Sequence, residues 1–179
     1  MESRARFKSG DPEYCPPGYS FFINFDFYIL HFAMSKSFPR LFTVNEANEL
    51  LSSITPLMDR IAENLGLLRK RSGTVIREER LSPDSPDLME RLKRDDSIVG
   101  IIQEVQGLVE KLNSLGCICK GVEEGLVDFP CLLGDEIVFL CWRYGEGNVE
   151  HWHRIEDGFA GRKPLLDAEG AGGSTDTYH

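Results

Sequence analysis

The sequence contains no cysteine or glycine motif that by itself identifies a functional site. Its five cysteines are an odd number and form no CxxC pair, which excludes a disulfide framework and a zinc ribbon. The glycine-containing stretch at residues 158–162 matches neither GxGxxG nor GxxxxGK[ST], and we expect no cofactor. There is no internal repeat. Free cysteines without a pairing pattern favour a reducing compartment, and we expect the protein to be cytoplasmic.

Positive charge is also scarce. Lysine and arginine number 20 against 29 aspartate and glutamate residues, and the formal net charge is -9. Binding to a phosphate backbone depends on lysine and arginine, so we expect no nucleic-acid partner. No apolar run reaches the ~20 residues that a membrane-spanning helix needs, so we also expect no membrane partner.

The first 35 residues differ from the rest of the chain. Basic residues precede an aromatic-rich run at residues 21–33, which is one feature of a signal peptide. Asn24 and Asp26 inside that run, and the absence of an A-x-A cleavage pattern, argue against export. We interpret residues 1–35 as an N-terminal extension that is disordered or untranslated, with Met34 as the initiator. Residues 36–166 then form a single domain, and the Ala/Gly/Ser-rich residues 167–179 form a disordered tail.

A long helix is predicted to begin after Thr43. Thr43 and Glu46 match a capping box, and Phe42 occupies the hydrophobic-staple position before it. Apolar residues follow at alternating spacings of four and three, in a coiled-coil-like seam: Ala47, Leu51, Ile54, Met58, Ile61, Leu65 and Leu68. Pro56 predicts a kink, and we expect the helix to end near Arg71.

A second helix is predicted to begin at Asp87 and end at Leu115, after a connection at residues 72–85. One apolar line lies at alternating spacings of three and four, with a second stripe beside it: Ile98, Ile101, Val105, Leu108, Leu112 and Leu115, then Val99, Ile102 and Val109. Because a two-helix seam needs only a narrow line, we expect this helix to cover both the first helix and a sheet. Gly116 is placed to end it with a left-handed conformation.

Four short strands are predicted after Gly116, at residues 117–120, 125–132, 136–144 and 149–154. The turns between them are too short for parallel crossovers, so the neighbours should be antiparallel. The expected fold class is therefore α+β, with a long two-helix antiparallel hairpin packed on a small antiparallel β-sheet of about four strands.

The region between Gly125 and Pro164 concentrates the residues that could carry chemistry. Five polar residues form our candidate site at one end of the sheet: Asp128, Arg143, His153, Asp157 and Arg162. Arg143, Arg162 and Lys163 could grip an anion through bidentate hydrogen bonds. The many nearby carboxylates make internal ion pairs the favoured interpretation.

Two further types of chemistry use overlapping residues. His151 and His153 share one face of the fourth strand and could bind a metal ion with Cys141, Asp128 or Asp157. No third-ligand motif accompanies them, so we favour hydrogen-bonded histidines over a metal site. Cys141, His153 and Asp157 are also the types needed for nucleophilic catalysis, but a buried strand cysteine behaves as a small hydrophobe. We assign no catalytic residue.

Four segments carry a family resemblance: FTVNEANELL at residues 42–51, GLVDFP at 125–130, LCWRYGE at 140–146 and WHRIEDGFAGRKPL at 152–165. Together they resemble the bacterial domain-of-unknown-function family 2203 over about residues 38–165. The resemblance implies no substrate or reaction, because the family is uncharacterised. It implies that all five residues of the candidate polar site belong to a family signature that also contains Trp142, Trp152, Gly158 and Gly161. It gives no support to a metal site based on His151.

These observations lead to two hypotheses about function. The first is a small cytoplasmic protein without catalytic activity, which acts as a protein-interaction module. Its partner would be a second copy or another helical protein, bound through the helix from Asp87 to Leu115. The alternative is an enzyme, or a protein that binds a small ligand, an anion or a metal, using the polar cluster at the sheet end.

Overall fold

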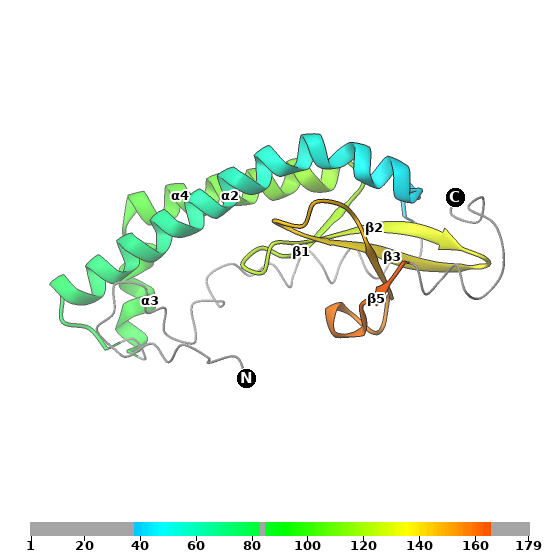
Figure 1. Ribbon diagram of the computed structural model, residues 1–179. Helices are drawn as coiled ribbons and strands as arrows, with labels where there is room; N and C mark the ends of the chain where they lie inside the picture. Colours follow the sequence, from blue (N-terminus) through cyan, green and yellow to red (C-terminus); the bar gives the residue numbers. More distant parts are fainter. Residues whose placement is uncertain (1–37, 83–84, 166–179) are drawn as a thin grey trace.

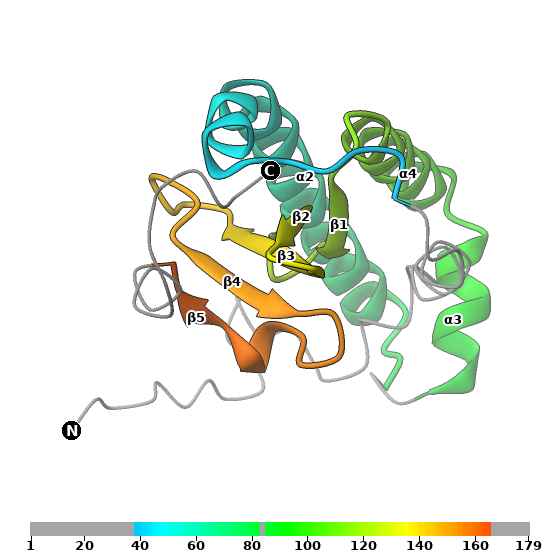
Figure 2. The same ribbon diagram turned by 90° about the vertical axis from the view of Figure 1, so that its right-hand side faces the viewer.

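The computed structural model describes residues 38–82 and 85–165. The predicted N-terminal extension and C-terminal tail lie outside these residues. A long helix and two shorter ones are followed by an antiparallel sheet, which is the predicted α+β architecture (Figures 1 and 2). The helical hairpin lies over one face of the sheet. Among the described residues, none of the helices combines the length and the apolar character that crossing a membrane requires.

The first helix, α2, spans Val44–Glu78 and begins as predicted. Thr43 and Glu46 form the capping box, with the Thr43 N–H donating to Glu46 Oε2 at 2.9 Å and the Glu46 N–H donating to Thr43 Oγ1 at 3.2 Å. Every apolar residue of the predicted seam is buried. The helix continues without a break through Pro56.

The predicted end of α2 near Arg71 is wrong. The helix runs seven residues further, to Glu78, because Ser72 and Val75 are buried at its far end. Burial against other helices outweighs the low helix propensity of Gly73, which costs roughly 1 kcal/mol in a helix interior. The connection predicted at residues 72–85 is correspondingly shorter.

The single helix predicted from Asp87 to Leu115 is two helices. α3 spans Pro86–Lys93 and α4 spans Asp96–Ser114, with Arg94 and Asp95 between them. The predicted helix is interrupted at Asp95 because the Asp95 side chain caps α4. It accepts hydrogen bonds from the N–H groups of Ser97 and Ile98. α3 turns away from the α2–α4 hairpin at the end distant from the sheet (Figure 1).

Five strands form the sheet, where about four were predicted. They are β1 (Ile118–Gly121), β2 (Leu126–Leu133), β3 (Glu136–Arg143), β4 (His151–Arg154) and β5 (Lys163–Pro164). Their spatial order follows the chain, and every neighbouring pair is antiparallel. The missed strand β5 has two residues, one a proline, so its sequence carries no strand pattern. It pairs with β4 after the short 3₁₀ helix η2 (Phe159–Gly161).

The main core lies between the hairpin and the sheet. α4 packs on both α2 and β1, as its wide apolar face predicted. The sheet contributes alternate residues of β2 and β3: Val127, Phe129, Cys131, Val138, Leu140 and Trp142. A second cluster joins α2, α3 and α4 beyond the sheet: Leu68, Val75, Leu88, Leu92 and Ile98.

Candidate functional site

The polar residues of the sheet lie on its outer face, turned away from the helices. Side chains alternate along a strand, and the neighbours of Asp128 and Cys141 in sequence, Val127 and Trp142, belong to the main core. Asp128 in β2 lies directly opposite Cys141 in β3, which in turn lies opposite His151 in β4. His153 is two residues further along β4, on the same face. Four polar side chains from three adjacent strands therefore share this face.

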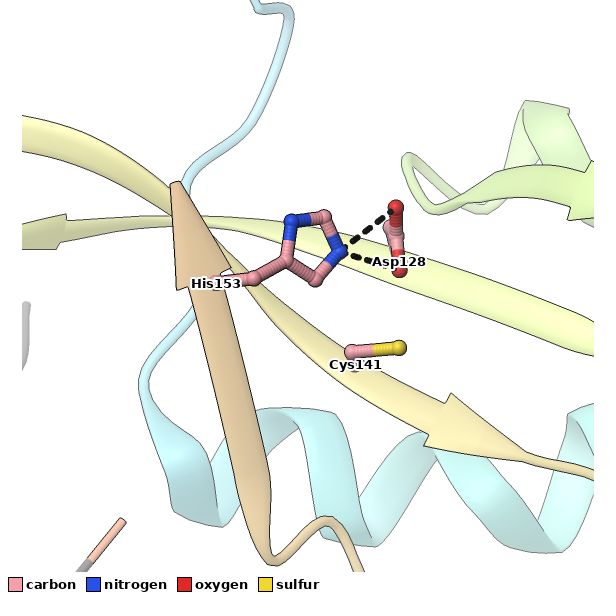
Figure 3. A group of neighbouring side chains, drawn as sticks. All are labelled: Asp128, Cys141 and His153. Carbon is pink, nitrogen blue, oxygen red and sulfur yellow. Dashed lines mark hydrogen bonds and ion pairs between the residues drawn. The ribbon is translucent and has the colours of Figure 1, made fainter. Parts of the chain in front are cut away.

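Asp128 and His153 form a buried pair (Figure 3). His153 Nε2 lies 3.4 Å from Oδ1 and 3.4 Å from Oδ2 of Asp128, which is longer than a good charge-assisted hydrogen bond. The other ring nitrogen, Nδ1, lies 2.7 Å from the carbonyl oxygen of Arg154. A carbonyl only accepts, so Nδ1 carries a hydrogen and donates it. Burial opposes a charged imidazole, but the hydrogen bonds to Asp128 and Arg154 outweigh it and raise the pKa of His153.

The Cys141 thiol lies beside this pair and is unsuited to nucleophilic catalysis. Its side chain is buried, and burial together with the negative charge of Asp128 raises its pKa well above the ordinary value. A reactive cysteine needs a lowered pKa, because the thiolate is the nucleophile. The Arg162 guanidinium opposes the shift but does not reverse it.

Arg162 belongs to a different pair, with Glu146. Its Nη1 donates to Glu146 Oε1 at 2.9 Å and its Nη2 donates to Oε2 at 2.7 Å, a bidentate geometry. Nη2 also donates to the carbonyl oxygen of Cys141 at 3.1 Å, which ties the β4–β5 region to β3. Burial disfavours the Glu146 carboxylate, but hydrogen bonds from Arg162 and the Arg143 backbone outweigh it and lower the pKa of Glu146.

The remaining two residues of the predicted polar site do not join these pairs. The side chains of Arg143 and Asp157 are both exposed. The Asp157 region is a tight turn, since a Cβ added to Gly161 would lie 2.3 Å from the Asp157 Cβ. The predicted five-residue site is thus a buried Asp128–His153 pair, an Arg162–Glu146 pair and two exposed side chains.

Glu146 is the residue that sequence reasoning missed. It follows β3 in a turn, where strand alternation assigns no face to a side chain. Its carboxylate binds Arg162 and accepts from the Arg143 N–H at 2.8 Å, and its carbonyl oxygen accepts from Trp142 Nε1 at 2.9 Å. Its place in the LCWRYGE segment was the available signal.

The structure also shows which of the predicted metal ligands lie close enough together to bind one ion. Within the described residues, one group of three donor side chains is compact enough to hold a metal ion, namely Asp128, Cys141 and His153. Of the five predicted candidates, Asp128, Cys141 and His153 are in this group, whereas His151 and Asp157 are not.

Comparison with known families supports the resemblance seen in the sequence. Residues 40–165 match the model of a family described as an uncharacterized conserved protein family, DUF2203. The chain belongs to this family. No curated protein and no solved structure matches it.

The DUF2203 region includes both polar pairs and the whole helical hairpin. It runs from two residues before Phe42 to the residue after β5, so it includes every helix and strand that the structure describes. Because the family is uncharacterised, the activity has to be inferred from the residues themselves.

Proposed function

We propose that the protein is a non-catalytic, cytoplasmic protein-interaction module that associates with a second copy through its helical hairpin. The observation that carries the proposal is the pairing of the candidate polar residues. Arg162 and Glu146 neutralise each other's charge within the fold, and Asp128 and His153 contact each other in a buried position. Catalysis needs a nucleophile or acid–base group directed at a common substrate position, and the raised pKa of Cys141 argues against its use as a nucleophile.

The hairpin supplies the surface for association. α2 contains 35 residues, a length of about 52 Å at 1.5 Å per residue, and the hairpin extends well beyond the sheet (Figure 1). Leu67 on α2 keeps 48% of its surface exposed, and Val99 and Ile102 on α4 are half-buried. Apolar side chains left partly exposed on a projecting helix pair are suited to packing against helices of a partner.

The cysteines support a cytoplasmic location. Cys117, Cys119, Cys131 and Cys141 are all free and buried in the described part of the chain. Buried, unpaired thiols support the proposal of a reducing cytoplasm.

Light scattering coupled to size exclusion tests the proposal on the full chain over a range of concentrations. We expect a dimer, and Leu67→Glu should weaken dimerisation by about tenfold or more, because it places a charge in the contact. Phe159→Glu is the matched control: Phe159 is 44% exposed but lies in η2, away from the hairpin. This control should dimerise like the unaltered chain.

Two results would overturn the proposal. One is a strict monomer at high concentration. The other is a dimer whose affinity is unchanged by Leu67→Glu or is reduced as much by Phe159→Glu.

A further inference from the structure

We propose that Asp128, Cys141 and His153 form a binding site for one divalent transition-metal ion of the zinc type. This inference is independent of self-association, since it rests on the outer face of the sheet. The three side chains come from β2, β3 and β4, and one donor atom from each lies within 4.8 Å of the other two. All three residues are buried, and the sulfur, the carboxylate and the imidazole lie close together in Figure 3.

The hydrogen bonding of His153 prepares Nε2 to bind a cation. Because Nδ1 donates to the Arg154 carbonyl at 2.7 Å, the neutral imidazole has its lone pair on Nε2. That lone pair points at the two oxygens of Asp128, both 3.4 Å away. A deprotonated Nε2 and a carboxylate that face each other in a buried site need a cation between them, which is either a proton on Nε2 or a metal ion. A metal ion supplies this charge, and the Nδ1–carbonyl bond is the usual outer-shell support of a metal-bound histidine.

The donor distances are compatible with tetrahedral coordination. Bonds of about 2.0–2.3 Å to zinc place neighbouring donor atoms about 3.3–3.8 Å apart. The separation between His153 Nε2 and each Asp128 oxygen, 3.4 Å, already lies within this interval. The upper limit of 4.8 Å for the whole group means that side-chain adjustments of about 1 Å complete the geometry.

The donor set identifies the class of metal. One thiolate, one imidazole and one carboxylate are ligands that zinc shares with cobalt and nickel, whereas magnesium and calcium prefer oxygen donors alone. Three protein ligands leave one further position on a tetrahedral ion. The alternative to a metal ion between His153 and Asp128 is a proton on Nε2, which would make an imidazolium–carboxylate pair. The experiment below distinguishes the metal ion from the proton.

Cobalt titration of the chelator-treated full chain is the first test. A bound thiolate should give a sulfur-to-cobalt charge-transfer band in the near ultraviolet, together with visible bands typical of tetrahedral cobalt, and one equivalent should saturate both. Zinc added afterwards should displace cobalt and abolish the bands. Cys141→Ser should remove the charge-transfer band, and His153→Ala should weaken cobalt binding about 100-fold or more, because even outer-shell changes cost 10–100-fold.

Cys131→Ser provides the matched control. Cys131 is also a buried strand cysteine, but it lies in the main core on the helix-facing side of the sheet. This variant should keep the charge-transfer band and the affinity of the unaltered chain. Circular dichroism of each metal-free variant establishes that it is folded.

A measurement on the unaltered chain covers the case in which a ligand variant does not fold. X-ray absorption at the zinc edge should show one sulfur at about 2.3 Å with nitrogen and oxygen at about 2.0–2.1 Å. A shell without sulfur, a cobalt complex unaffected by Cys141→Ser, or the absence of saturable binding would overturn the proposal and leave the protonated pair as the occupant.

Discussion

Arg71 in α2 binds Asp95, the residue that separates α3 from α4, through two hydrogen bonds to one carboxylate oxygen. Arg71 Nε and Nη2 donate to Asp95 Oδ2 at 3.0 and 2.7 Å. The other oxygen, Oδ1, accepts from the N–H groups of Ser97 and Ile98 at the start of α4. A single carboxylate therefore joins α2 to α4 at the point where α3 turns away.

Replacing Asp95 with alanine should destabilise the protein by about 1–2 kcal/mol, because it removes a helix cap. Urea unfolding measures the change. Asp95→Asn is the matched variant, since asparagine also caps helices but cannot form the ion pair with Arg71. It should cost less than Asp95→Ala; an equal cost would show that the cap contributes nothing.

Titration of the Asp95 carboxylate should make the free energy of unfolding depend on pH in the acidic range. Hydrogen bonds from Ser97 and Arg71 lower the pKa of Asp95 from 3.8 to about 2 in the folded protein. A group whose pKa is lower in the folded state stabilises the protein above its unfolded pKa, and this contribution disappears as the pH falls through the folded pKa. We expect the free energy of unfolding to decrease between about pH 4 and pH 2. The decrease should be smaller in Asp95→Asn, and an identical acid dependence in the two proteins would contradict the assignment.

Arg162→Ala should destabilise the protein by about 3 kcal/mol, because it leaves the partly buried Glu146 carboxylate without its partner. The side chain of Arg162 is 12% exposed and that of Glu146 is 30% exposed. Arg154→Ala is the control, since it breaks the exposed pair between Arg154 and Glu136 and should cost less than about 1 kcal/mol. Thermal unfolding of Arg162→Ala, Glu146→Gln and the variant with both changes measures the coupling between the two side chains, with Arg154→Ala measured alongside. Equal losses in Arg162→Ala and Arg154→Ala would contradict a structural role for Arg162.

The described cysteines should be unreactive in the native, metal-free protein. Burial raises the pKa of Cys117 to about 12, of Cys119 to about 12 and of Cys131 to about 11, and it raises the pKa of Cys141 further. Since the thiolate is the reactive species, a thiol reagent should modify them only on unfolding. In a Cys15→Ser variant, we expect no rapidly reacting thiol before urea is added and four afterwards. A fast-reacting Cys141 would contradict its placement.

Local sequence patterns were sufficient to predict the starts of α2 and α3 and the faces of the strands. Thr43 and Glu46 predicted the capping box because its hydrogen bonds join residues three apart, and alternation placed Cys141 and Trp142 on opposite faces of β3. Gly116 has the predicted left-handed conformation, with φ of 94°. These features depend on residues that are close in the chain, so they can be predicted from periodicity and residue type.

Features that depend on distant residues were missed or misplaced. The end of α2 at Glu78 and the break at Asp95 depend on contacts among three helices, and β5 exists only because Lys163 and Pro164 pair with β4. For the candidate site, the sequence identified Asp128, Cys141, His153 and Arg162 as chemically capable residues. Glu146 escaped notice because its partner is 16 residues away.

The sequence alone determined which residues face the core, where α2 and α3 begin and that the fold is α+β, because these follow from side-chain periodicity and backbone hydrogen bonding within short segments. Only the tertiary structure decided how the polar residues are divided. Strand register brings Asp128, Cys141 and His153 together across three strands, and the β4–β5 connection places Arg162 on Glu146. Distances between residues far apart in the chain are set by the packing of the whole sheet, and no local pattern encodes them.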